Sequence, residues 1–202
     1  LAEALMTYQN QEDTVVLGLP RGGVPVAYEV ARKINAPLDV FIVRKLGVPG
    51  NPELAMGAIA SGGLRVMNEN VLSRSGISEE QVDDIAEKER QELQAREETY
   101  RGARPETDIT GKTVLLVDDG LATGASMRAA ISALKAHNPE KIIVAVPTAP
   151  ADTCEEFKTM VDNVVCLQTP SPFWGVGGSY QNFSQTTNDE VRQLLKTRII
   201  DH

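Results

Sequence analysis

Residues 114–127 read Val114-Leu115-Leu116-Val117-Asp118-Asp119-Gly120-Leu121-Ala122-Thr123-Gly124-Ala125-Ser126-Met127. The run begins with four apolar residues, Val and Leu, which favours a strand buried on both faces. Two carboxylates and a loop of small residues follow. The next apolar residues fall at the i, i+3, i+4 and i+7 positions of one helix face, at Met127, Ala130, Ile131 and Leu134. The stretch therefore predicts a buried strand whose carboxyl end turns directly into a helix.

The predicted turn is suited to binding an anion. Unpaired backbone N–H groups and the helix dipole favour negative charge at a helix N-terminus. Gly120 and Gly124 allow close approach of a ligand to the backbone, and Thr123 and Ser126 add hydroxyl donors. Two carboxylates beside a phosphate would repel it, so the acids fit better with sugar hydroxyls or a metal. An ordinary turn with an acidic helix start is the other interpretation.

This stretch resembles the ribose-phosphate loop of the type I phosphoribosyltransferases, in which four apolar residues precede two acids and a Thr-Gly-rich turn. The resemblance implies that Asp118 and Asp119 face the ribose 2′- and 3′-hydroxyls of phosphoribosyl pyrophosphate. They would touch Mg²⁺ only indirectly, through substrate or water. The resemblance also implies that the following loop wraps the 5′-phosphate, with Leu121, Ala122, Thr123, Gly124, Ala125 and Ser126.

A second strand, loop and helix lie near the N-terminus. Residues 14–19 form an apolar run, and residues 24–34 carry the helix pattern. An Arg among backbone donors suits a multiply charged anion. The resemblance implies that the loop between them binds pyrophosphate, and that family often holds this loop with a non-proline cis peptide. The loop consists of Pro20, Arg21, Gly22 and Gly23. A plain glycine-rich turn is the alternative.

The strand predicted at residues 38–43 ends in two adjacent cations. Residues 44–53 are rich in Pro, Gly and Asn, which predicts a mobile loop. Residues 54–61 and 64–68 predict two β segments joined at a Gly-Gly hairpin signal. The resemblance implies that residues 44–68 are the flexible loop and flap that close over the active site. Arg44 and Lys45 would then neutralise the departing pyrophosphate, whereas a solvated cation pair is the alternative.

Residues 76–101 form a charged helical insertion. Ser78 and Gln81 make a capping-box pattern at its start. The apolar stripe is thin, so the sequence predicts a long helix that is mostly exposed. The alternative is a stripe that packs on another subunit.

Strands at 141–147 and 163–167 alternate with a helix at 151–161. This alternation predicts one α/β domain over residues 1–202, with a doubly wound, mainly parallel five-stranded sheet flanked by helices. Every candidate binding loop then falls at the carboxyl ends of strands. A last helix is expected after Thr187, with a docking stripe at Val191, Leu194, Leu195 and Ile199.

Residues 169–184 differ in composition, because they hold four of the nine aromatic residues among Gly and Pro. Such a loop favours a stacking surface. The resemblance implies a C-terminal hood that covers the acceptor base, with Phe173 and Trp174 as binding residues. An aromatic mini-core that holds the loop is the alternative.

Composition limits the partners. A net charge of −8 and a pI of about 4.9 disfavour nucleic acid, and no apolar run approaches the length of a membrane span. Cys154 and Cys166 lie in apolar-patterned segments and are expected as reduced, buried thiols of a cytoplasmic protein. Two histidines exclude a histidine-rich metal site. Leu1 falls inside a helical pattern, so a natural chain that extends before it is expected.

The resemblance implies a Mg²⁺-dependent pentosyltransferase of nucleotide salvage, expected as a homodimer. It would move the phosphoribosyl group of phosphoribosyl pyrophosphate to a purine-like or other nitrogen heterocycle, with release of pyrophosphate. A non-catalytic regulator that binds the same sugar phosphate, and a hydrolase that uses the same pocket, remain open. Ala122 replaces the Asp of the hypoxanthine/guanine enzymes, while Gly120 and the helix at 78–100 depart from the adenine enzymes, so the acceptor stays open.

Overall fold

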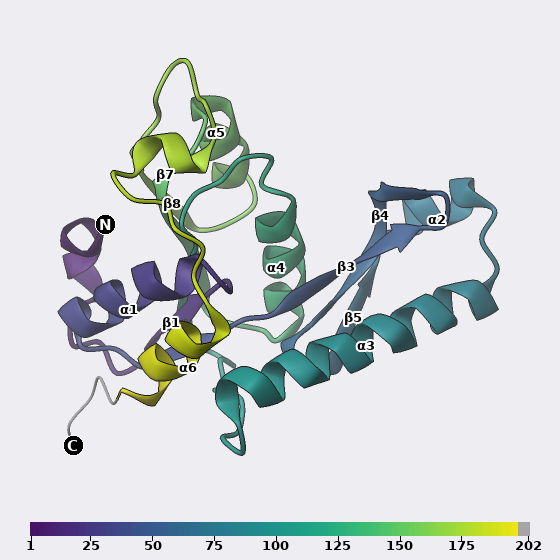
Figure 1. The fold of residues 1–202 in the computed structure, drawn as a ribbon, viewed down its shortest axis with the longest axis horizontal. Helices are drawn as coiled ribbons and strands as arrows, with labels where there is room; N and C mark the ends of the chain where they lie inside the picture. The colour runs from purple at the N-terminus through teal and green to yellow at the C-terminus, as the bar shows by residue number, and fades with distance from the viewer. Residues whose placement is uncertain (198–202) are drawn as a thin grey trace.

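The computed structural model describes residues 1–197, except for the side chains of residues 52 and 53. Its larger sheet has five strands in the order β2-β1-β6-β7-β8 (Figure 1). All four strand pairs are parallel, which confirms the predicted doubly wound sheet. The strands are β1 (Thr14–Gly18), β2 (Leu38–Val40), β6 (Thr113–Val117), β7 (Lys141–Thr148) and β8 (Asn163–Gln168).

Helices cover both faces of this sheet because successive strand residues point to opposite sides. On one face, Val16 and Leu115 pack with α1 (Gly23–Ile34) and the 3₁₀ helix η1 (Ala2–Tyr8). On the other face, Val15 and Leu116 pack with α4 (Ala125–Ala136) and α5 (Ala151–Lys158). The continuous apolar runs of β1 and β6 follow from this two-sided burial.

A second, antiparallel sheet stands where residues 44–53 were predicted to form a loop. Its strands are β3 (Val43–Val48), β4 (Asn51–Ala60) and β5 (Leu64–Met67), called the flap sheet below. Pro49 and Gly50 form the tight turn between β3 and β4, where Gly50 has a φ of 80°, whereas Gly47 lies in β3 and Pro52 in β4. Leu46 and Met56 are fully buried, so the strands around this turn have a core of their own. The expected turn between β4 and β5 forms through the 3₁₀ helix η2 (Ser61–Gly63).

The long charged helix is α3 (Glu79–Arg101), and Ser78 and Gln81 form the predicted capping box. Its stripe packs in the same chain, where Val82 and Leu93 share a core cluster with Leu46 and Met56. Figure 1 shows α3 and the flap sheet projecting together from the core, with α4 facing the other side of that sheet. The short helix α2 (Glu69–Ser75) follows β5.

The hood and then the helix α6 (Asn188–Lys196) follow β8 in the chain. The hood contains the 3₁₀ helix η3 (Val176–Ser179). Thr187 and Glu190 form the expected capping box, and Val191 and Leu195 are buried. Ile199 lies outside the described residues.

The two cysteines correct the expectation of reduced thiols, because Cys154 of α5 and Cys166 of β8 form a disulfide. Their Cα atoms are 6.7 Å apart, within the range that a disulfide spans. The helix and the following strand lie against each other, which brings together residues that are 12 positions apart in sequence. Among the described residues, no helix has the length and apolarity needed to cross a bilayer.

Candidate active site

Asp118 and Asp119, the acid pair, come directly after β6 at the centre of the parallel sheet. The backbone N–H of Asp119 donates to Asp118 Oδ1 at 2.9 Å. Burial raises the pKa of Asp118 well above its usual value, and the neighbouring charge of Asp119 raises it further. Burial also raises the pKa of Asp119. Hydroxyl donors or a cation placed here would replace the water that the acid pair has lost.

The loop after the acid pair forms a hollow of about 150 Å³, called the phosphate cup below. It is lined by Asp118 and by residues 120–127 at the start of α4. Buried Leu121 anchors the loop, while Ala122, Thr123, Ala125 and Ser126 are exposed. Gly124 has a φ of 71°, and a Cβ there would lie 2.7 Å from the ring of Phe157. The position therefore requires glycine, and the cup presents backbone N–H groups and two hydroxyls to a ligand.

Arg128 supports this loop from α4. Its guanidinium donates to the carbonyl oxygen of Thr123 at 2.6 Å and makes two hydrogen bonds of 2.7 Å to Glu156 of α5. It also lies over the ring of Phe157, 5.3 Å from the centroid. Sequence analysis missed this residue. The available signal was an Arg one turn inside a helix whose N-terminus was expected to bind an anion.

The loop of residues 20–23 follows β1, which pairs with β6, and so lies beside the acid pair. The Pro20–Arg21 peptide bond is cis, as the family resemblance implied. A Cβ on Gly22 would lie 1.9 Å from Asp119 Oδ2, and one on Gly23 would lie 2.9 Å from Asp118 Oδ1. Gly23 requires glycine because a Cβ there would also lie 2.8 Å from the carbonyl oxygen of Val117, whereas a Cβ on Gly22 would displace the carboxylate of Asp119. The structure thus brings together residues 20–23, 118–119 and 121–126.

The hood docks onto the acid pair from the β7 side. The Tyr180 hydroxyl donates to the carbonyl oxygen of Asp119 at 2.5 Å, and burial raises the pKa of that hydroxyl to about 12. The Tyr180 and Phe183 rings lie 5.1 Å apart and contact each other, although Phe183 is 50% exposed. Phe173 is half-buried, and Trp174 is 85% exposed.

The two adjacent cations lie on opposite faces of β3. Arg44 faces α3, where two of its nitrogens lie 2.6 and 2.7 Å from Glu89 Oε2. Lys45 lies on the face toward α4. The structure therefore separates the two residues that the sequence placed together at the leaving group.

The family follows from comparison with known proteins. A model of the phosphoribosyl transferase domain matches residues 1–182. This chain belongs to the type I phosphoribosyltransferase family. The assignment agrees with a parallel sheet that carries an acid pair and a Thr-Gly loop at its central strand.

Two relatives match most of this chain. Rv0571c of Mycobacterium tuberculosis, a phosphoribosyl transferase by its assigned name, is 50% identical over 181 residues. That match covers 90% of this chain and 41% of Rv0571c, so the chain spans about two fifths of this curated relative. The crystal structure of TT1426 from Thermus thermophilus has a TM-score of 0.86 at 44% identity and covers 96% of this chain and 91% of that one.

A shorter match carries less information. The bifunctional protein PyrR of Actinobacillus pleuropneumoniae is 48% identical over 42 residues, which cover 21% of this chain and 24% of PyrR. A match of that extent supports a common family but does not assign the activity of PyrR to this chain.

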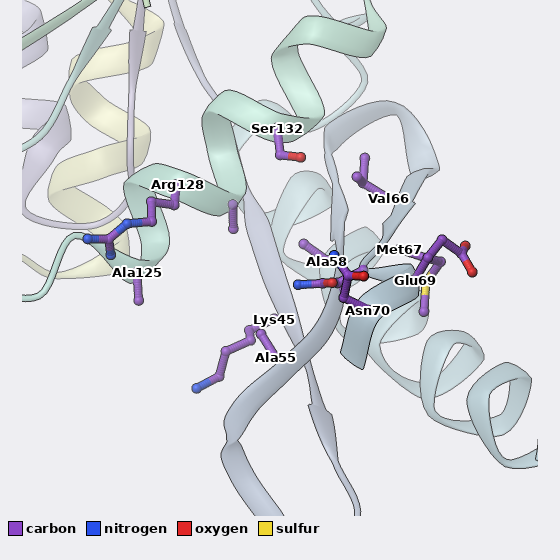
Figure 2. Close-up of a pocket in the computed structure, with 13 residues that line it drawn as sticks. Lys45, Ala55, Ala58, Val66, Met67, Glu69, Asn70, Ala125, Arg128 and Ser132 are labelled. Carbon is purple, nitrogen blue, oxygen red and sulfur yellow. The ribbon is translucent and has the colours of Figure 1, made fainter. Parts of the chain in front are cut away.

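Beside the phosphate cup, a cleft of about 570 Å³ separates α4 from the flap sheet (Figure 2). We call it the flap cleft. Ala125 lines both the cup and the cleft, so the two spaces adjoin. The other lining residues are Lys45, Ala55, Gly57, Ala58, Val66, Met67, Asn68, Glu69, Asn70, Arg128, Ala129 and Ser132.

Proposed function

We propose that this chain transfers the phosphoribosyl group of phosphoribosyl pyrophosphate to a nitrogen heterocycle and releases pyrophosphate. One observation supports the proposal above all others. The acid pair, the phosphate cup and the glycine backbone of residues 22–23 meet at the carboxyl ends of two neighbouring strands. A sugar with anions at both ends requires such a set of contacts.

In this proposal, the cup binds the 5′-phosphate through the backbone N–H groups at the start of α4 and the hydroxyls of Thr123 and Ser126. Asp118 and Asp119 accept hydrogen bonds from the ribose 2′- and 3′-hydroxyls. Hydrogen bonds to a charged acceptor contribute about 1.5–3 kcal/mol each. The contacts fix the ribose so that C1′ faces the acceptor, which supplies rate through orientation.

The leaving pyrophosphate lies against residues 20–23, where Arg21 and backbone N–H groups face it, with Lys45 approaching from β3. A ring-nitrogen lone pair of the acceptor forms the bond to C1′. The C1′–O bond breaks, and its electron pair stays on pyrophosphate. A proton on the attacking nitrogen passes to pyrophosphate or water. Cations at the leaving group lower the barrier because negative charge grows there as the bond breaks.

Arg44 has a positioning role in this scheme. Its ion pair with Glu89 fixes one face of β3 against α3. Since alternate strand residues point to opposite sides, the same contact directs Lys45 toward α4.

The acid pair fits a Mg²⁺ ion that substrate oxygens hold. The described residues contain no group of three or more His, Cys, Asp or Glu side chains that could hold a metal. Mg²⁺ usually keeps several waters and binds through one or two carboxylates plus substrate phosphates. When bound, it would neutralise charge on the pyrophosphate and ribose oxygens. Asp118 and Asp119 would contact it through water or substrate.

Titration calorimetry of phosphoribosyl pyrophosphate with Mg²⁺, followed by a pyrophosphate-release assay with a panel of bases, tests the proposal. We expect phosphoribosyl pyrophosphate to bind and ribose 5-phosphate to compete with it. We also expect one of the bases to accelerate the release of pyrophosphate. Binding without release would favour the regulator, and release that no base accelerates would favour the hydrolase. The cytoplasmic location, the homodimer and the role in nucleotide salvage stay predictions.

A further inference from the structure

The disulfide between Cys154 and Cys166 lies at one edge of the parallel sheet. Cys154 belongs to α5, and Cys166 belongs to β8, which is last in the strand order (Figure 1). Every residue of β8 is at least partly exposed, whereas all five residues of β6 are buried. Regions with few buried apolar contacts open most readily. The crosslink therefore fixes α5 to the strand of this sheet edge, where packing alone holds it less firmly.

A small thiol can reach this disulfide. Both cysteines line a surface hollow of about 180 Å³, together with Ala151, Glu155, Lys158, Val164 and Thr169. These residues differ from those that line the phosphate cup. Cys154 is buried, whereas Cys166 is only partly buried. The rate of thiol–disulfide exchange depends on access and on which sulfur is attacked, so an incoming thiolate should attack Cys166.

The same helix supports the phosphate cup from below. Glu156 accepts two hydrogen bonds of 2.7 Å from Arg128, whose guanidinium also donates to the carbonyl oxygen of Thr123. Phe157 is fully buried, and a Cβ on Gly124 would lie 2.7 Å from its ring. Two neighbouring residues of α5 thus contact the loop that forms the cup, one through an ion pair and one through packing.

α5 is short enough to transmit a displacement along its length. It has eight residues and is joined to β7 by residues 149–150 and to β8 by residues 159–162. Cys154 and Phe157 are three positions apart, so they lie on one face of the helix, and both belong to one core cluster. Rigid elements and packed side chains carry coupling between sites. A shift of the helix at Cys154 would therefore move Phe157 against the cup.

We propose that Cys154–Cys166 is a site of thiol–disulfide exchange whose oxidation state sets the affinity of the phosphate cup. The reagent is a dithiol. One of its thiolates attacks Cys166 Sγ and forms a mixed disulfide. The bond between the two cysteines breaks, and its electron pair stays on Cys154 Sγ, which takes a proton from water.

The second thiolate of the reagent then attacks the reagent sulfur of the mixed disulfide, and Cys166 leaves as a thiolate that is protonated in turn. The dithiol is oxidised to a disulfide, and the protein gains two electrons and two protons. In the oxidised chain α5 is fixed and supports the cup, whereas in the dithiol form α5 is freer and the cup binds phosphate more weakly. The effect on binding rests on the proposed function, which assigns the cup to the 5′-phosphate.

Reduction of the folded, unmodified chain with dithiothreitol tests the proposal, because Cys154 and Cys166 are its only cysteines. A thiol-reactive dye should detect no free thiol before reduction and two afterwards. Calorimetry should show that the dissociation constant of ribose 5-phosphate rises by roughly fivefold or more, the lower end of typical couplings between sites. Reoxidation with hydroxyethyl disulfide should restore the original value.

Two further measurements support the interpretation. The double variant Cys154→Ser with Cys166→Ser should bind ribose 5-phosphate as weakly as the reduced chain and should not respond to dithiothreitol. Hydrogen exchange needs no ligand. Backbone amides of residues 121–126 should exchange faster in the reduced chain, while those of β6 should exchange at the same rate in both states.

Equal affinity for ribose 5-phosphate in the two states, with equal exchange rates at residues 121–126, would overturn the coupling. A disulfide that dithiothreitol reduces only in denaturant, or two free thiols that hydroxyethyl disulfide does not oxidise, would overturn the exchange site. If ribose 5-phosphate binds neither form, the proposed function fails. Hydrogen exchange at residues 121–126 then decides separately whether the disulfide controls the cup.

Discussion

At the scale of single residues, the acid pair serves ligand binding at the expense of folding stability. Burial and the neighbouring charge of Asp119 raise the pKa of Asp118 from its ordinary 3.8. The folded chain therefore holds a proton at pH values where the unfolded chain has lost it. Stability from this site is fully present below the unfolded pKa and is lost as pH rises through the folded one. At neutral pH the charged carboxylate destabilises the fold.

Asp118→Asn should therefore stabilise the ligand-free chain at neutral pH by about 1 kcal/mol, a typical gain from relieving a strained site. The gain should vanish as the pH falls below 3.8, where the wild-type carboxyl becomes protonated in both states. The same variant should bind phosphoribosyl pyrophosphate more weakly, because the charge-assisted hydrogen bonds are lost. Urea unfolding in EDTA across this pH range, with calorimetry at neutral pH, gives both quantities. Equal affinity in both proteins would contradict the role of the acid pair.

Sequence and structure agree where the determinants are local. The strand-to-helix turn at residues 117–125 and the cap at Ser78 depend on neighbours within a few positions, so the pattern alone predicts them. Contacts between distant segments are not encoded in such patterns. Arg128 reaches Glu156 only once α4 and α5 lie side by side, and Tyr180 reaches Asp119 only after the hood folds back. The disulfide belongs to the same class. The opposite directions of Arg44 and Lys45 are local to β3, and the prediction missed them because it made residues 44–53 a loop.

At the scale of elements, the alternation of β3 gives its two cations different roles. Lys45→Ala should lower kcat by roughly 10²-fold, the scale seen when one group that stabilises transition-state charge is removed. Arg44→Ala should lower kcat less and reduce the melting temperature, because Arg44 binds Glu89 and not the substrate. Arg65→Ala, which removes an exposed ion pair with Asp83 of α3, is the matched control and should change neither. A larger loss of kcat in Arg44→Ala would show that Arg44 leaves Glu89 and contacts pyrophosphate.

The packing of α3 on the flap sheet can be measured as an element of the fold. Leu93 is 1% exposed, so Leu93→Ala should destabilise the chain by about 2–5 kcal/mol through the cavity it leaves. Leu167→Ala, at a side chain that is 47% exposed, should cost much less. Urea unfolding at several protein concentrations separates the two interpretations of the stripe. If the loss of stability in Leu93→Ala becomes smaller as the protein concentration rises, a second subunit also covers the apolar stripe of α3.

At the scale of the whole molecule, one buried ion pair joins the charged helix to the parallel sheet. Arg101 at the end of α3 is 8% exposed, and its Nε lies 2.9 Å from Oδ1 of Asp39 in β2, which is 5% exposed. The guanidinium also donates to the carbonyl oxygen of Val40 at 2.6 Å and to Glu97 at 2.9 Å. The backbone N–H of Thr107 donates to the other oxygen of Asp39. These contacts fix the end of α3 to the edge strand of the parallel sheet.

Arg101→Ala should destabilise the chain by about 3–5 kcal/mol, because it leaves the carboxylate of Asp39 buried without its cation. Arg32→Ala, which removes an exposed pair with Glu29, should cost at most about 1 kcal/mol. The double variant Asp39→Leu with Arg101→Met removes both charges and should recover most of the loss, since apolar pairs of similar volume often replace buried ion pairs without cost. Urea unfolding measures all three. If the double variant folds stably, its affinity for ribose 5-phosphate should be unchanged, because the phosphate cup lies on other elements. A double variant that loses as much stability as Arg101→Ala would show that the loss does not come from the unpaired charge of Asp39.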